Sequence, residues 1–364
     1  MDNGMTDFAE LGRRYREGDG VPKDIRKAVE YLTKAADMGD SRAASSLGYI
    51  YMVGEGCDAD PKRAESYLRM ASDNGITEAM CNLGFLLSES DSDESIRMFE
   101  LAARSGSVMA MKNLASLYHG GNGVTRDCAV AAEWYGKASD MGDIDSTCVL
   151  ASMYRNGDGI PADKQKAADL YRKAADAGDS DAQYDLAFML DSGEGIPSDR
   201  LLAREYFKKS ADQGDTDACL CIGGILYEEG DYEGAENYFL KAAMKGEVKA
   251  QYNLGLLYIG GQLGYTDPAK ASEWFSESAE QGFVLSHTML GSILLDSGKV
   301  SEATKHFRTA AEEGEPTAMY NLGALGLSGQ IDADEKESMS WVARAASQGF
   351  PPALELLTKL NGQC

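Results

Sequence analysis

Basic residues are scarce in this chain of 364 residues, which has 35 lysines and arginines against 59 aspartates and glutamates. The formal net charge of −24 at pH 7 opposes binding to nucleic acid and to anionic membranes, because both need a basic surface. We therefore expect neither as a partner. The excess of acidic residues fits the solubility of a large surface, or the steering of a basic partner towards the chain.

Long apolar runs are also missing. No stretch approaches the roughly 18 apolar residues of a membrane helix, so membrane insertion is not expected. The segment from Met1 to Leu11 has neither a basic region nor an apolar run, and it does not read as a secretory signal. A cytoplasmic location is expected, and a periplasmic or secreted one stays open if a signal peptide was removed.

Histidine is rare, and the cysteines show no pairing pattern. The three histidines, His119, His287 and His306, suggest no catalytic triad or metal cluster. The seven cysteines are odd in number and do not follow the repeat described below, so a reducing compartment is expected rather than a disulfide framework. We expect no catalytic, metal-binding or cofactor-binding residues, and hence no enzyme.

Glycine, by contrast, is abundant and regularly placed. Ten glycines, each between two Ala-rich helical patterns, follow one another at steps of 31 to 36 residues: Gly39, Gly75, Gly106, Gly142, Gly178, Gly214, Gly246, Gly282, Gly314 and Gly349. Such a period marks an array of one supersecondary unit, each unit too small to bury its apolar face alone.

Each period predicts two helices. The first has a small residue, a leucine four residues later and then glycine or alanine, as at Leu254 and Gly255, which places a stripe of these residues on one helical face. The second starts after an aspartate N-cap such as Asp163 and has an aromatic pair in its middle, such as Trp274 and Phe275. Helices flank the intervening Gly-x-Gly loops, so these are predicted turns rather than phosphate cradles.

These columns resemble Sel1-like repeats (SLR), a family related to tetratricopeptide repeats. Close matches are NLGLLY at residues 253–258 and KAADAGD at residues 173–179. The resemblance covers about residues 7–350 and implies an all-α fold, an α/α superhelical solenoid of about ten helix-turn-helix repeats. The expected units, within a single repeat domain of residues 1–350, are about 7–40, 41–76, 77–107, 108–143, 144–179, 180–215, 216–247, 248–283, 284–315 and 316–350. Residues 351–364 are expected to form a C-terminal capping helix and tail.

The relation to tetratricopeptide repeats also implies that the first helices line a concave groove. The aromatic and apolar residues expected to face it are Tyr49, Phe85, Tyr184, Phe188, Leu220, Tyr252, Leu256 and Tyr320. The asparagines expected there, which suit the backbone of an extended peptide, are Asn82, Asn113, Asn253 and Asn321. The residues alone leave open that the aromatic side chains are buried against the next repeat, and that the asparagines bond to a neighbouring helix.

The resulting hypothesis is a non-catalytic adaptor or scaffold that binds a protein or peptide segment in its concave groove, with a monomer favoured. Some bacterial members of the family are linked to cell-wall components, so one alternative is a cell-envelope protein that binds or hydrolyses cell-wall fragments. A second alternative is an architectural solenoid that assembles with itself.

Overall fold

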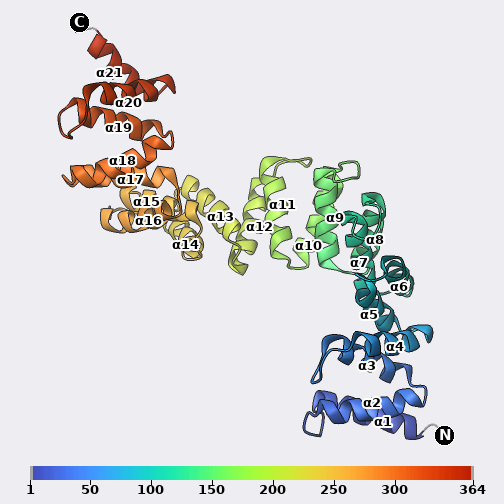
Figure 1. The fold of residues 1–364 in the computed structure, drawn as a ribbon. Helices are drawn as coiled ribbons and strands as arrows, with labels where there is room; N and C mark the ends of the chain where they lie inside the picture. The colour runs from blue at the N-terminus through green and yellow to red at the C-terminus, as the bar shows by residue number, and fades with distance from the viewer. Residues whose placement is uncertain (1–2, 362–364) are drawn as a thin grey trace. The chain divides into compact units, whose positions relative to one another are not determined.

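The computed structural model describes residues 3–361, with side chains from 7 to 360, and all regular elements in that range are helices (Figure 1). The first helices of the repeats, with the final helix, are α1 (Asn3–Glu17), α3 (Ser41–Val53), α5 (Thr77–Leu87), α7 (Val108–Gly120), α9 (Ile144–Asn156), α11 (Ser180–Ser192), α13 (Thr216–Glu229), α15 (Val248–Gly260), α17 (Val284–Asp296), α19 (Pro316–Leu327) and α21 (Pro351–Asn361). The second helices are α2 (Ile25–Asp37), α4 (Pro61–Asp73), α6 (Ser92–Arg104), α8 (Cys128–Asp140), α10 (Lys164–Asp176), α12 (Arg200–Gln213), α14 (Tyr232–Ala243), α16 (Pro268–Glu280), α18 (Val300–Glu312) and α20 (Glu335–Ser347). The predicted all-α array of helix pairs is confirmed.

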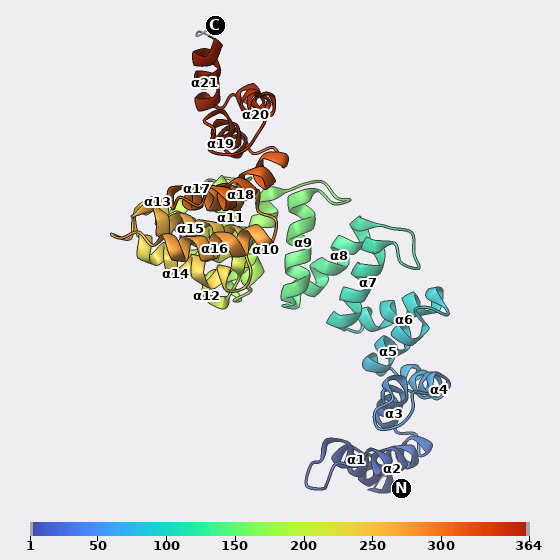
Figure 2. The ribbon, with the colours of Figure 1, turned by 60° about the vertical axis from the view of Figure 1, so that its left-hand side comes forward.

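The chain divides into two compact units. The first comprises Met1–Ala182 with Gly193–Pro197, and the second comprises Gln183–Ser192 with Ser198–Cys364. Within each, first helices pack along the second helices of their own repeats, as α3 does along α4 and α19 along α20 (Figures 1 and 2). Each compact unit is therefore a solenoid segment with its own interior.

The helix ends follow the local signals of the sequence. The five predicted N-caps each accept a hydrogen bond from the backbone N–H three residues later; they are Asp24, Asp60, Asp163, Asp199 and Asp267. Pro61 and Pro268 occupy the next position, where a missing N–H is harmless. The ten repeat-ending glycines all have φ between 80° and 99°, a conformation that a β-carbon disfavours.

A second class of glycine lets the two helices of a repeat touch. A β-carbon at Gly255 would lie 2.5 Å from the ring of Phe275, and one at Gly48 would lie 2.6 Å from the side chain of Leu68. Both of these partners are fully buried. Close packing therefore compensates the roughly 1 kcal/mol that glycine costs inside a helix relative to alanine.

The apolar interior passes from one repeat to the next. In the second compact unit, Phe307 of α18, Leu322 of α19 and Val342 of α20 belong to one buried cluster. Ala353 of α21 joins this cluster and is itself fully buried. Helix α21 thus covers the last helix pair, as expected of a capping helix.

A recurring contact between a basic and an acidic side chain links the end of a first helix to the loop of the following repeat. Three such pairs, each joining residues 39 apart with contacts of 2.7 to 2.8 Å, lie in the first compact unit: Arg16–Glu55, His119–Asp158 and Arg155–Glu194. A second basic side chain lies near each acid, respectively Lys23, Arg126 and Lys164. We call these three contacts the inter-repeat rungs; pairs this open to solvent contribute about 0–1 kcal/mol each.

Candidate functional site

Three of the aromatic side chains predicted to face the groove are exposed to solvent. Tyr49 of α3 is 39% exposed, Phe85 of α5 47% and Phe188 of α11 42%. The guanidinium of Arg16 lies 5.2 Å from the centre of the Tyr49 ring, but Tyr49 is still exposed with this contact in place. Exposed aromatic residues that recur at one offset of a repeat are typical of a binding surface.

The tyrosines at the other predicted aromatic offset are half-buried. Their rings lie with centroids 5.1 to 5.7 Å from phenylalanine rings in the pairs Tyr184–Phe207, Tyr252–Phe275, Tyr252–Phe283 and Tyr320–Phe350. Burial raises the pKa of Tyr184 to about 12 and raises the pKa of Tyr252 as well. Leu220 and Leu256 are also half-buried. These residues therefore belong partly to the packing between helices and are only partly exposed to solvent.

The four predicted asparagines share one property. None of them makes a side-chain hydrogen bond to another described residue, and all are half-buried: Asn82, Asn113, Asn253 and Asn321. The Nδ2 atom of Asn113 is fully buried without a partner, whereas the amides of the other three reach solvent. The alternative of a bond to a neighbouring helix is not seen in the described part of the chain, so three amides are free to pair with a ligand.

A cavity of about 230 Å³ opens beside two of these predicted residues. Its lining comes from α13, α14 and α15 of the second compact unit and consists of Gly224, Tyr227, Glu228, Phe239, Asn253 and Leu256. Small-molecule sites occupy roughly 300–1,000 Å³, so this cavity is the right size for an anchoring side chain rather than for a whole ligand. Its apolar lining residues and the Asn253 amide suit an apolar side chain with its flanking backbone.

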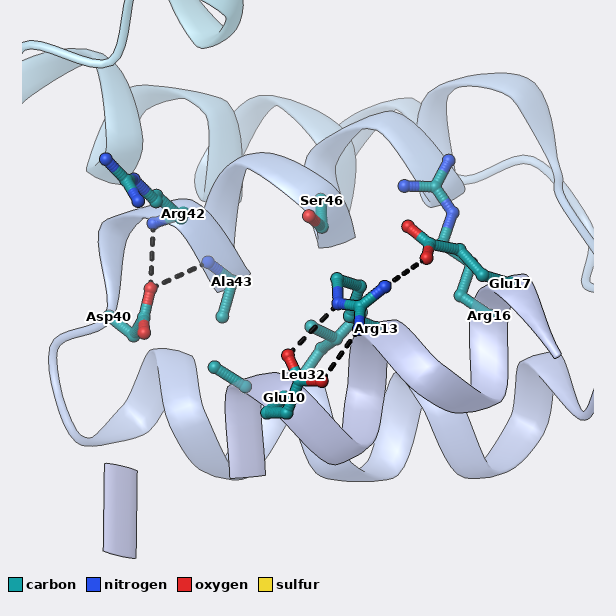
Figure 3. A pocket seen from close by; sticks show the side chains of 10 residues that line it. Glu10, Arg13, Arg16, Glu17, Leu32, Asp40, Arg42, Ala43 and Ser46 are labelled. Atoms are coloured by element: carbon teal, nitrogen blue, oxygen red, sulfur yellow. Dashed lines mark hydrogen bonds and ion pairs between the residues drawn. The ribbon is translucent and has the colours of Figure 1, made fainter. Parts of the chain in front are cut away.

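A larger pocket of about 460 Å³ lies among α1, α2 and α3, where the sequence analysis expected no site. Figure 3 shows Arg13 between Glu10 and Glu17, with Arg16 beside Glu17 and with Arg42 at the other end of the pocket, beside Asp40. Hydrogen bonds from Arg13 to Glu10, and to Asp19 at 2.9 Å, raise the pKa of the guanidinium. Acids of the same segment therefore neutralise Arg13 within this pocket.

The structure also brings together three polar side chains that no sequence motif connects. His119, Cys128 and Asp158 come from the end of α7, the start of α8 and the loop after α9, and their ligand atoms lie within 4.8 Å of one another. The sequence signal that could have found them is the 39-residue spacing of the inter-repeat rungs.

The two histidines of repeat nine face each other. Nδ1 of His287 in α17 lies 3.0 Å from Nδ1 of His306 in α18. One ring must donate to the other, so both nitrogens cannot carry a proton in this contact. Burial lowers the pKa of both histidines; the charge of His287 lowers the pKa of His306 further, and Glu302 opposes that shift.

We predict that this pair makes the folded state less stable as the pH falls from about 7 to about 5. The unfolded histidines bind protons near their ordinary pKa of about 6.5, and the folded ones only at lower pH, so acid favours the unfolded state. His306→Tyr places there the residue that repeat seven has at Tyr238, and it should weaken the pH dependence. Urea unfolding of both proteins at the two pH values measures the difference; an identical pH dependence would contradict the prediction.

No helix in the described part of the chain has the length and apolar character needed to cross a membrane. The six cysteines described by the structure, Cys57, Cys81, Cys128, Cys148, Cys219 and Cys221, are free.

The sequence matches a family model for the Sel1 repeat in nine segments: residues 9–40, 41–76, 77–107, 108–143, 144–179, 180–215, 218–247, 248–283 and 316–350. Among solved structures, it is similar to c5321, described as a protective antigen of uropathogenic Escherichia coli strains with an SLR fold. The TM-score is 0.81 at 34% identity, over 96% of this chain and 78% of that one. A Sel1 repeat protein from Oxalobacter formigenes gives a TM-score of 0.62 at 28% identity, over 81% of this chain and 90% of that one.

Curated relatives match over shorter segments. An uncharacterized protein of Neisseria meningitidis, NMB1327, is 30% identical over 35% of this chain and 27% of its own length. Chitin synthase regulatory factor 3 of Schizosaccharomyces pombe is 30% identical over 36% of this chain and 16% of its length. The ERAD-associated E3 ubiquitin-protein ligase component HRD3B of Arabidopsis thaliana is 35% identical over 24% of this chain and 14% of its own length. The chain thus spans about a quarter or less of these relatives.

Proposed function

This chain belongs to the Sel1 repeat family, and from that premise we propose that it is a non-catalytic adaptor which binds a protein segment on the face formed by its first helices. The observation that carries the proposal is the cavity among α13, α14 and α15, whose lining includes the apolar side chains of Leu256 and Phe239 and the unpaired amide of Asn253. This combination suits one apolar anchor side chain and the peptide backbone beside it.

Other residues on first helices extend this surface. The exposed ring of Phe188 lies in the same compact unit as the cavity, and Tyr49 and Phe85 offer exposed rings in the other unit. Burying one such side chain contributes roughly 1.5–3 kcal/mol, while association costs several kcal/mol in lost freedom. A stable complex therefore needs several anchors, which a repeated column of residues supplies.

The names of two relatives support an adaptor role. One is a regulatory factor of chitin synthase, and another is a component of an E3 ubiquitin ligase. Both names describe proteins that work with or on another protein. This is the role that we propose for the present chain, with a partner of its own.

The proposal predicts that Asn253→Ala weakens binding about tenfold, because one or two hydrogen bonds to the partner's backbone are lost. The fold should be unaffected, since Asn253 has no protein partner and alanine favours a helix. The partner is first captured from the source cell with the full chain, and the affinity of the purified pair is then measured by calorimetry.

Asn237→Ala is the matched control. Asn237 is an exposed asparagine on α14, a second helix of the same compact unit. Unchanged binding in the control and weaker binding in Asn253→Ala would support the first-helix face. Equal affinities in both variants and the wild type would refute it.

A further inference from the structure

One inter-repeat rung differs chemically from the other two. The basic residue is Arg16 in the first rung and Arg155 in the third, but it is His119 in the second. A second difference lies beneath the loop of the next repeat. The second glycine of that loop is Gly56, Gly159 or Gly195 in the three rungs. A β-carbon added there would contact the side chain of Ile25, Cys128 or Lys164, respectively. At these two positions the second rung therefore has histidine and cysteine, where the first has arginine and isoleucine and the third has arginine and lysine.

The geometry of this rung brings a nitrogen, a sulfur and an oxygen ligand to one place. Nε2 of His119 lies 2.7 Å from Oδ2 of Asp158, and these atoms and the thiol of Cys128 lie within 4.8 Å of one another. The Cys128 residue is 7% exposed, whereas the side chains of His119 and Asp158 are 31% and 41% exposed. The group is thus anchored on a buried thiol and open to solvent on its other side.

Arg126 fixes this arrangement without occupying the ligand atoms. Its Nη2 donates to Oδ1 of Asp158 at 2.8 Å, and its Nε donates to the backbone carbonyl of His119 at 2.9 Å. Oδ2 of Asp158 therefore remains directed at Nε2 of His119. Outer hydrogen bonds of this kind orient the ligands of protein metal sites.

We propose that His119, Cys128 and Asp158 bind one Zn²⁺ ion, which ties the helix pair α7–α8 to the loop that follows α9. Zinc accepts nitrogen, sulfur and oxygen ligands in a tetrahedron, whereas Ca²⁺ and Mg²⁺ prefer oxygen alone. Thiolate and carboxylate balance the charge of the ion, and three protein ligands leave one position for water or for a partner's side chain. Binding releases the thiol proton of Cys128, and His119 coordinates as the neutral imidazole through Nε2, with its one proton on Nδ1.

The spacing of the ligands requires side-chain rotation. Ligands about 2.0–2.3 Å from a tetrahedral zinc ion lie roughly 3.3–3.8 Å from one another. His119 and Asp158 must therefore separate slightly from their 2.7 Å contact. Both histidine and aspartate are partly exposed, so they have room to move.

The test uses the full chain without an affinity tag and stripped of metal. Titration with Zn²⁺ in a calorimeter should show one site per chain, and Co²⁺ should give an absorption band of thiolate-to-cobalt charge transfer. Cys128→Ser should abolish the cobalt band and weaken zinc binding at least about 100-fold, since a ligand is lost rather than only its outer support. Cys57→Ser, which removes an exposed cysteine elsewhere, should leave both signals unchanged.

His119→Arg is the second variant. It restores the residue type found in the other two rungs, so the fold should be retained, and thermal unfolding checks this. We expect the cobalt band to be lost and zinc affinity to fall as in Cys128→Ser. A band that survives in His119→Arg, or equal zinc affinity in the wild type and both variants, would overturn the three-ligand site. So would a wild-type chain without saturable binding of zinc.

Discussion

Phe275→Ala is expected to lower the free energy of unfolding by about 3–5 kcal/mol. The side chain of Phe275 in α16 is fully buried, and its ring contacts Tyr252 and the backbone space left by Gly255. Alanine would remove most of this contact and leave a cavity that the packed helices cannot fill. Urea unfolding followed by circular dichroism measures the loss.

Phe188→Ala is the control for this substitution. Phe188 is an aromatic residue of the same compact unit and is 42% exposed, so its removal should change stability by less than about 1 kcal/mol. Similar losses in the two variants would mean that Phe275 is not the packing element that the structure shows.

Gly255→Ala is expected to destabilise the chain, although alanine is the better helix former. The added β-carbon would lie 2.5 Å from the ring of Phe275, and overpacking of this kind costs about 1–3 kcal/mol or more. This cost exceeds the gain of up to about 1 kcal/mol from helix propensity. Combining the substitution with Phe275→Leu should recover part of the loss, because the shorter side chain makes room; thermal unfolding measures all three proteins.

Gly224→Ala provides a control of opposite sign. Gly224 lies inside α13, and a β-carbon there would meet no atom within 4 Å. Alanine at this position should therefore stabilise the chain by up to about 1 kcal/mol. Stabilisation by both glycine substitutions would contradict the close contact between α15 and α16.

The fold could be predicted from the sequence because its determinants are local and repeated. Aspartate caps such as Asp163, the left-handed glycine at Gly178 and the stripe around Leu254 each define one part of a helix pair. The same pattern recurs along the chain, so a repeat in which it is weak is still identified from its neighbours.

The candidate site was less accessible to sequence reasoning. The offsets identified which residues lie beside the packed stripe, but Tyr252 contacts Phe283, the residue before α17 of the next repeat, and this contact depends on how that helix is placed. The exposure of Phe188 and the absence of a hydrogen bond to Asn253 likewise depend on how neighbouring helices are placed. Periodicity within one helix contains no information on that placement.

The inter-repeat rungs were missed for a related reason. Arg155 and Glu194 lie in different repeats, and each is an ordinary charged residue by itself. Only the stacking of repeats brings them together. The same stacking joins His119 to Asp158 above Cys128, so no local motif marks this group.

Site-specific photo-crosslinking tests the binding face most directly. A photoreactive amino acid replaces either Phe188 on a first helix or Leu201 on a second helix; both side chains are exposed and belong to the same compact unit. The adaptor proposal predicts that the captured partner crosslinks strongly from position 188 and weakly or not at all from position 201. Crosslinking from position 201 alone, or with equal yield from both, would contradict binding on the first-helix face.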